Sequence, residues 1–189
     1  MIVLKSWIRE WMSFWVFLKY KDIWNLYEYL KKTQKKSGLC ASVYSHYLDK
    51  HGSFIGLGAS FANRPCTPHG ILGIFVSEDA KIGKDAVIFQ QVTIGSVYSN
   101  ASKHQGAPVI GDNCYIGAGA KIIGNVHIGN NCRIGANAVV YEDMPDNSVA
   151  LCSPTQIREY ESAPDNHFYV TRADGHKEYW ENGGFHRVK

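Results

Sequence analysis

Two histidines could carry chemistry, and both lie beside breaks in an otherwise regular sequence. His69 is flanked by Pro68 and Gly70, and His104 lies in a polar stretch, residues 96–108. Imidazole titrates near neutral pH, so it is well suited to take a proton from a hydroxyl group. Considered alone, His69 would be interpreted as a turn residue and His104 as a solvated loop residue. Because both lie at the margins of one repetitive region, we predict that both are functional.

The region that must position these histidines is an internal repeat of six residues. A large aliphatic residue occurs at every sixth position, with one interruption between Ile94 and Ile110. A small or β-branched residue follows most of these aliphatics four positions later, and glycine often follows directly. A period of six fits neither an α-helix nor an alternating strand. The aliphatic positions are Val76, Ile82, Ile88, Ile94, Ile110, Ile116, Ile122, Ile128, Ile134 and Val140.

A longer period of eighteen indicates how the repeat folds. Residues 110–127 match residues 128–145 at an offset of eighteen, which is three sixes. A chain that turns a corner every six residues closes a triangle in eighteen and stacks on itself at roughly the 4.8 Å strand spacing. The fold class predicted is mainly β: a parallel β-helix of hexapeptide repeats. About ten residues must be extruded as a loop at residues 96–109, and such an insertion often marks function.

Stacked triangular coils form a prism, so each residue of the repeat faces either the interior of the prism or its surface. We expect the aliphatics inside and the polar residues between them outside, with glycine at the corners supplying backbone freedom, including positive φ where needed. The test positions are Ile82, Ile88, Ile116 and Ile134 for the interior, and Lys84, Asp112 and Asn130 for the exterior.

The sequence divides into three regions. Residues 1–52 are an N-terminal helical segment, residues 53–157 form the β-helix with its extruded loop, and residues 158–189 are a polar C-terminal tail. Alternation around Asp174-Gly175 predicts a hairpin within the tail.

The first 36 residues are rich in aromatic side chains, and their spacing predicts two helices. Trp7, Trp11 and Trp15 share one stripe, and the longest uncharged run is far shorter than the ~20 residues of a membrane span. This segment carries eight basic and three acidic residues, a net charge of +5 in a chain whose total is +3. No nucleic-acid-binding motif accompanies the charge, so we expect no nucleic-acid partner. The helices are expected either to cap the first coil or a neighbouring subunit, or to rest on a membrane as a peripheral contact.

The cysteines and histidines do not suggest a metal site. The five cysteines form no CxxC or Cys/His cluster, and His46 and His51 lie in a stretch expected to be helical. We therefore expect no bound metal. An odd number of cysteines, two of them at equivalent filler positions of the repeat, favours a reduced, cytoplasmic setting.

Residues 68–95, 103–126 and 147–157 together resemble the serine acetyltransferase branch of the hexapeptide acyltransferases. Many sugar O-acetyltransferases of surface-polysaccharide pathways are similar to that branch. The resemblance covers roughly residues 55–157. It implies a left-handed β-helix, a homotrimer, acetyl-CoA as donor lying between adjacent prisms, and one active site at each subunit interface.

The resemblance also implies roles for individual residues. His69 matches the general base, His104 matches the histidine that helps to hold the acceptor, and Lys103 is its substrate-binding neighbour. Attack of an alcohol on a thioester needs such a base. The positions implied for donor binding are Gly95, Gly117, Ala118, Gly135 and Ala136.

Three departures from the family pattern bear on the acceptor. Serine-specific members have Asp where this chain has Pro68 and Phe54, and Arg where it has Lys103, which lacks the bidentate fork for a carboxylate. With no carboxylate in place, we expect a backbone carbonyl to set the tautomer of His69. The leading hypothesis is therefore an acetyl-CoA-dependent O-acetyltransferase acting on a sugar hydroxyl of a glycan or its precursor. The alternative is a serine O-acetyltransferase of cysteine biosynthesis.

Two other functions of β-helices are less consistent with the sequence. A metal-dependent hydratase needs several histidines on the coils, and only His127 lies within the regular repeat. An ice-binding β-helix needs a flat array of threonines, and Thr93 is the only threonine in the repeat.

Overall fold

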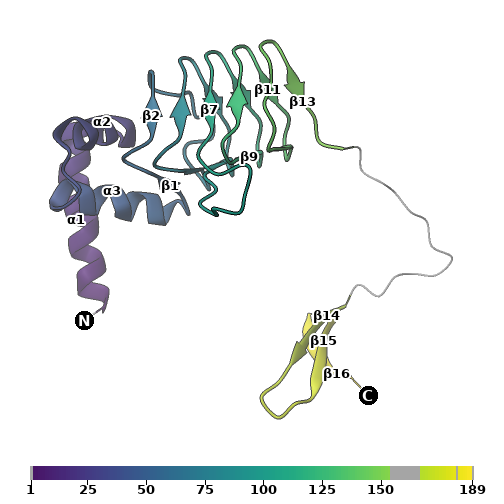
Figure 1. Ribbon diagram of the computed structural model, residues 1–189. Helices are drawn as coiled ribbons and strands as arrows, with labels where there is room; N and C mark the ends of the chain where they lie inside the picture. Colours follow the sequence, from purple (N-terminus) through teal and green to yellow (C-terminus); the bar gives the residue numbers. More distant parts are fainter. Residues whose placement is uncertain (1, 154–166, 182, 189) are drawn as a thin grey trace. The chain divides into compact units, whose positions relative to one another are not determined.

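The computed structural model describes residues 2–153, 167–181 and 183–188. The chain divides into two compact units, residues 1–153 and 154–189, and each is described by itself. The first unit holds the helices and the stacked coils, and the second holds a small antiparallel sheet (Figure 1).

Three helices precede the coils: α1 (Ile2–Tyr20), α2 (Ile23–Thr33) and α3 (Leu39–Lys50). The two predicted helices are confirmed, and α3 occupies the tyrosine-rich stretch that follows them. Helix α2 begins where the Asp22 carboxylate accepts the Asn25 N–H at 3.0 Å. It ends at Gln34, whose backbone is left-handed with φ 53°. In the part of the chain that the structure describes, no helix is both long enough and apolar enough to cross a membrane.

The coils form three parallel sheets, one on each face of the prism, which confirms the predicted β-helix (Figure 1). Sheet A contains β1 (Phe54–Ile55), β3 (Phe75–Val76), β6 (Thr93–Gly95), β9 (Lys121–Ile123) and β12 (Val139–Val140). Sheet B contains β2 (Ser60–Phe61), β4 (Lys81–Ile82), β7 (Val109–Ile110) and β10 (His127–Ile128). Sheet C contains β5 (Val87–Ile88), β8 (Tyr115–Ile116), β11 (Arg133–Ile134) and β13 (Val149–Ala150).

The strand register confirms the period of eighteen and locates two insertions. Ile110 pairs with Ile128, an offset of eighteen, whereas Ile82 pairs with Ile110, an offset of 28. The difference is the ten-residue loop expected after Ile94. The first coil is also longer than the rest, because Phe54 pairs with Phe75 at an offset of 21. Its extra three residues were not expected from the sequence.

The predicted interior is confirmed. Ile82, Ile88, Ile116 and Ile134 are each 3% exposed or less, and Lys84, Asp112 and Asn130 are exposed. The small residues of the repeat, such as Ala80 and Ala120, are also buried. Successive aliphatics of equal register therefore stack into one continuous core along the prism.

The glycines after the aliphatics serve a purpose other than the expected one. Their backbone is not left-handed; the left-handed corner positions are instead taken by residues such as Asn113 and Asn131, both at φ 56°. Asn tolerates this region better than most residues. At Gly117 a Cβ atom would lie 2.7 Å from the Ala136 nitrogen and 2.9 Å from the Ile134 oxygen in the next coil. Glycine is required there because the coils approach closely.

The helices close the first edge of the prism. The Tyr27 hydroxyl donates to the Ala59 carbonyl at 2.5 Å, and the Tyr44 hydroxyl donates to the Ile55 carbonyl at 2.8 Å. Burial raises the pKa of both tyrosines, so the hydroxyls stay protonated and remain donors. The Lys31 ammonium also donates to Ala59, at 2.6 Å. These bonds satisfy carbonyls of the first coil, which has no coil beneath it.

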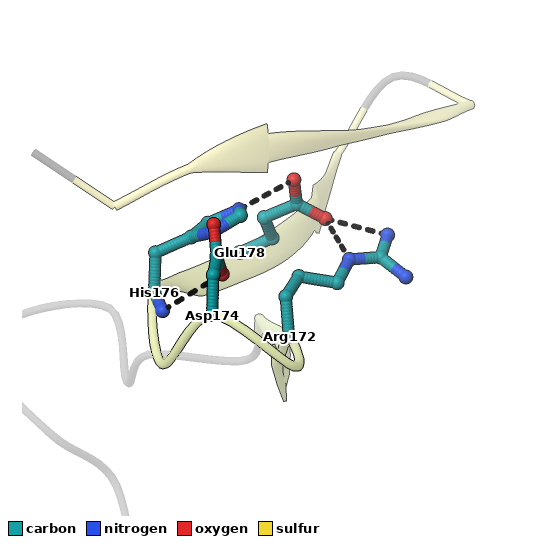
Figure 2. A network of polar contacts seen from close by, with 4 residues as sticks. All are labelled: Arg172, Asp174, His176 and Glu178. Atoms are coloured by element: carbon teal, nitrogen blue, oxygen red, sulfur yellow. Dashed lines mark hydrogen bonds and ion pairs between the residues drawn. The ribbon is translucent and has the colours of Figure 1, made fainter.

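The second unit is a three-stranded antiparallel sheet of β14 (Phe168–Thr171), β15 (Lys177–Glu181) and β16 (Gly184–Arg187). The hairpin predicted at Asp174-Gly175 joins β14 to β15, and the third strand was not predicted. A polar network surrounds this turn (Figure 2). Glu178 accepts from the Arg172 guanidinium at 2.5 Å and from the His176 Nε2 at 3.1 Å, and Asp174 bonds to the other His176 nitrogen.

A core substitution should reveal how much the stacked aliphatics contribute. Ile116→Ala removes a fully buried side chain and leaves a cavity, so we expect a loss of about 2–5 kcal/mol in the free energy of unfolding. Lys81→Ala, on the exposed side of sheet B, should change it by less than about 0.5 kcal/mol. Denaturant unfolding of the two variants measures both. Equal losses would contradict the assignment of inside and outside.

The turn network of the second unit should make its hairpin pH-dependent. Hydrogen bonds to Glu178 and then Asp174 raise the pKa of His176, and this stabilisation is lost as pH rises through that raised value. The His176 backbone N–H bonds to Asp174 and the His176 side chain bonds to Glu178, and these bonds lower the pKa of both carboxyl groups. The stability that the two carboxylates contribute to the hairpin is lost as pH falls through the lowered pKa values. The hairpin should therefore be most protected between about pH 4 and 6.5.

Amide hydrogen exchange in β14 and β15 of the full chain, corrected for the intrinsic pH dependence of exchange, measures this effect. His176→Asn should flatten the dependence above pH ~6.5. An unchanged profile in that variant would show that the network does not hold the hairpin.

Candidate functional site

His69 lies in the three extra residues of the first coil. Phe54, Ser60 and Cys66 follow one another at intervals of six residues, and Cys66 pairs with Val87 on sheet C. The next interval, from Cys66 to Phe75 on sheet A, is nine residues. The insertion therefore widens the corner between sheet C and sheet A. A turn in which the Gly70 N–H donates to the Thr67 carbonyl at 3.0 Å places the imidazole of His69 on the surface.

A side-chain amide orients His69, and not the backbone carbonyl that we expected from the sequence. The His69 Nδ1 lies 2.7 Å from the Gln90 Oε1, on the next coil at the same corner. Since an amide oxygen only accepts, Nδ1 carries the proton and Nε2 is left with the lone pair of a base. The Phe89 ring meets the imidazole edge to face at 5.4 Å between centroids. The hydrogen bond fixes the tautomer of His69, and the two contacts together fix the plane of its ring.

His104 lies at a different corner of the prism, between sheet A and sheet B. The extruded loop leaves sheet A after β6 and is closed by paired backbone bonds between Val97 and Gly106, 2.9 Å each. The His104 carbonyl accepts the Asn125 N–H at 2.9 Å, so this end of the loop is attached to the neighbouring coil. A Cβ atom at Gly124 would lie 2.7 Å from the same carbonyl, and therefore only glycine fits beneath the loop.

The side chains at the loop end differ in how they are held. The His104 ring meets the Tyr141 ring edge to face at 6.2 Å and is half-buried. Lys103 is exposed. One chain therefore presents His69 at one edge of sheet A and His104 at the other, and it does not bring the two imidazoles together.

The residues implied in donor binding are divided between the same two corners. Gly117-Ala118 follows β8 and Gly135-Ala136 follows β11, both at the corner of His69. The N–H groups of Gly117 and Gly135 already donate to the next coil at 2.8 Å each. These two N–H groups are therefore not available to a ligand, whereas Ala136 is exposed at the same corner.

Gly95 lies at the corner of His104. Its carbonyl accepts the Gly124 N–H at 2.8 Å, beside the extruded loop. It lines a shallow groove of about 380 Å³ between sheet A and the loop, whose walls include Phe54, Phe75 and Tyr98. Phe54 therefore belongs to an apolar wall of this groove, and the first coil supplies no carboxylate from that position.

Comparisons with known proteins show which family the repeat resembles. Residues 107–142 match the family described as bacterial transferase hexapeptide (six repeats). A serine acetyltransferase of Staphylococcus aureus is 39% identical over 100 residues, which are 53% of this chain and 46% of that protein. The chain contains hexapeptide repeats and is similar to the serine acetyltransferases. The resemblance inferred from the motifs is thereby confirmed, and the chain spans about half the length of the curated relatives it matches.

Solved structures extend the similarity beyond the repeat. Serine acetyltransferase isoform 3 of Entamoeba histolytica, in complex with cysteine, has a TM-score of 0.61 and 28% identity, covering 73% of this chain and 50% of that chain. The soybean enzyme complexed with serine has a TM-score of 0.58 and 29% identity, covering 71% of this chain and 55% of that chain. The mainly β, left-handed hexapeptide β-helix is the fold of this protein.

Sequence reasoning missed Gln90 and Tyr141. Gln90 could not be placed against His69 because the eighteen-residue register fails in the first coil, where the offset is 21. The only available signal was that Gln90 occupies a corner position, two residues after the buried Ile88, where later coils carry alanine. Tyr141 lies just beyond the last regular aliphatic, Val140, and carried no signal of its own.

The hydrogen bond from His69 predicts distinct effects for two substitutions of Gln90. Gln90→Met keeps the length of the side chain but removes the acceptor, so the imidazole loses its fixed tautomer and kcat should fall about 10- to 100-fold. Gln90→Glu keeps an acceptor for the Nδ1 proton and should retain clearly more activity than Gln90→Met. Steady-state kinetics at saturating donor measures both, and equal activity of Gln90→Met and the wild type would disprove the orienting role.

Proposed function

We propose that this protein is an acetyl-CoA-dependent O-acetyltransferase in which His69 is the general base. The observation that carries the proposal is the hydrogen bond between His69 and Gln90, which leaves Nε2 free to take a proton, at the corner where Gly117 and Gly135 stack. The similarity to serine acetyltransferases supports acetyl-CoA as the donor.

In the proposed reaction, Nε2 of His69 removes the proton of the acceptor hydroxyl as its oxygen attacks the thioester carbonyl carbon. The carbon–sulfur bond then breaks, and the proton returns from the imidazolium to the departing CoA thiolate. The products are the O-acetyl ester, CoA thiol and a neutral His69. Gln90 holds the imidazole through both proton transfers.

We propose that the working enzyme is a homotrimer with a site at each subunit interface. The separation of His69 and His104 on opposite edges of sheet A supports this arrangement, since a neighbouring copy can bring its own loop against the corner of His69. Contacts that run from one edge of a subunit to the other edge of the next close into a ring. His104 and Lys103 then hold the acceptor from across the interface.

The first candidate for the acceptor is serine, which the names of the similar proteins favour. The sugar hydroxyl remains a second candidate because of three residues in this chain. Serine-specific members have Asp at the positions of Phe54 and Pro68, and Lys103 lacks the fork that binds a carboxylate in two places. CoA release with serine and with a panel of sugars and oligosaccharides separates the two. Activity with none of these acceptors would disprove the proposed function.

The five cysteines are all free thiols. This supports the proposal that the protein works in a reducing compartment such as the cytoplasm. Acetyl-CoA as donor is compatible with the same setting.

The shared site predicts complementation between two impaired variants. His69→Ala should lower kcat about 10²- to 10⁴-fold with little change in donor affinity, because the base acts on the acceptor. His104→Ala should raise the acceptor KM more than it lowers kcat. If each site takes His69 from one subunit and His104 from another, every trimer that contains both variants has one intact site of its three. Such trimers should regain about a third of the wild-type activity at an acceptor concentration well below the KM of His104→Ala.

Co-expression of the two variants with different tags, followed by purification through both tags, provides the mixed oligomers. Separately purified variants combined without exchange of subunits are the control. Mixed oligomers that stay as inactive as the parents would place the whole site within one chain.

A further inference from the structure

Helix α1 presents an apolar face that the rest of the described chain does not cover. Trp11, Phe14, Trp15 and Leu18 are 65%, 59%, 55% and 59% exposed. Their spacing of three and four residues places them on one side of the helix. Where a soluble protein exposes a cluster of large apolar residues of this kind, the cluster usually marks an interaction surface.

The opposite side of α1 already holds the helix in place. Val16 is 5% exposed, the Phe17 ring contacts the Tyr47 ring of α3 at 5.0 Å, and the Tyr20 ring contacts the Tyr29 ring of α2 at 4.8 Å. The exposed rings contact one another instead: Trp15 meets both Trp11 and Phe14 edge to face at 6.0 Å. The exposed face is therefore not needed to pack the three helices.

The charge of this segment indicates what covers the face. Residues 1–36 carry eight basic side chains and three acidic ones, and Lys19 and Lys21 follow the exposed face at the end of α1. A second copy of the same segment would bring two such positive charges together. An anionic lipid surface would instead attract them, and tryptophan is well suited to the boundary between headgroups and hydrocarbon.

We propose that α1 docks on the surface of an anionic lipid bilayer, with Trp11, Phe14, Trp15 and Leu18 buried at the headgroup boundary. Lys19 and Lys21 lie among the headgroups. The helix lies along the surface, since no described helix can cross a membrane.

Vesicle binding by the full chain tests the proposal. The probes are vesicles of phosphatidylcholine alone and of equal parts phosphatidylcholine and phosphatidylglycerol. The protein should sediment with the anionic vesicles and not with the neutral ones, and binding should weaken at least tenfold between about 0.1 M and 0.5 M NaCl. Absence of binding to the anionic vesicles at the lower salt would overturn the proposal.

Substitutions on the exposed face identify the surface that binds. The double variant Trp11→Ser, Trp15→Ser should bind anionic vesicles at least tenfold more weakly, while its CoA release in solution is unchanged. Leu39→Ser is the matched control, because Leu39 is 49% exposed on α3, away from the apolar face of α1, and should leave binding intact. Undiminished binding by the double variant would overturn the proposal. A second combination of results would also overturn it: the double variant has a lower mass in sedimentation than the wild type, and the wild type does not bind vesicles. The exposed face of α1 would then join two copies of the chain.

Discussion

Backbone hydrogen bonds between successive coils are the constraint on which the rest of this structure depends. The Gly111 N–H donates to the Ile128 carbonyl and the Gly117 N–H to the Ile134 carbonyl, at 2.8 Å each. Such bonds are made only when every coil keeps the same register as the one below it. The register in turn stacks aliphatic on aliphatic inside the prism and corner on corner outside. It also draws the coils so close that a Cβ at Gly117 has no room.

The same constraint explains where the candidate site lies. Additional residues cannot be accommodated within a strand without breaking the bonds to both neighbouring coils, so they emerge at corners. Three emerge beside His69 and ten form the loop that carries His104. Because the two insertions lie at opposite edges of sheet A, the two histidines are divided between two surfaces of one chain. The proposed homotrimer rests on that division.

The parallel β-helix could be predicted from the sequence because many positions of the repeat independently indicate the same arrangement of coils. Each aliphatic from Val76 to Val140 supports the same register, and the buried core agrees with all of them. The candidate site consists of residues that depart from the pattern, and the repeat does not predict which residues of the neighbouring coils such residues will contact. The ten residues of the loop were visible as a gap in the spacing, whereas the three residues around His69 fell in the first coil, before the regular repeat began. The backbone carbonyl was expected as the partner of His69 because no carboxylate stood at Pro68 or Phe54, and Gln90 could be found only in three dimensions.

Both histidines lie in insertions and neither lies in the repeating unit, and this has an evolutionary consequence. A duplication of eighteen residues would copy the aliphatic, the glycine and the corner asparagine, and so lengthen the prism by one complete coil. It would not copy the three residues beside His69 or the loop that holds His104. The array can therefore grow or shrink by whole coils while each chain keeps one His69 and one His104, so that the length of the protein and its proposed chemistry can be selected independently.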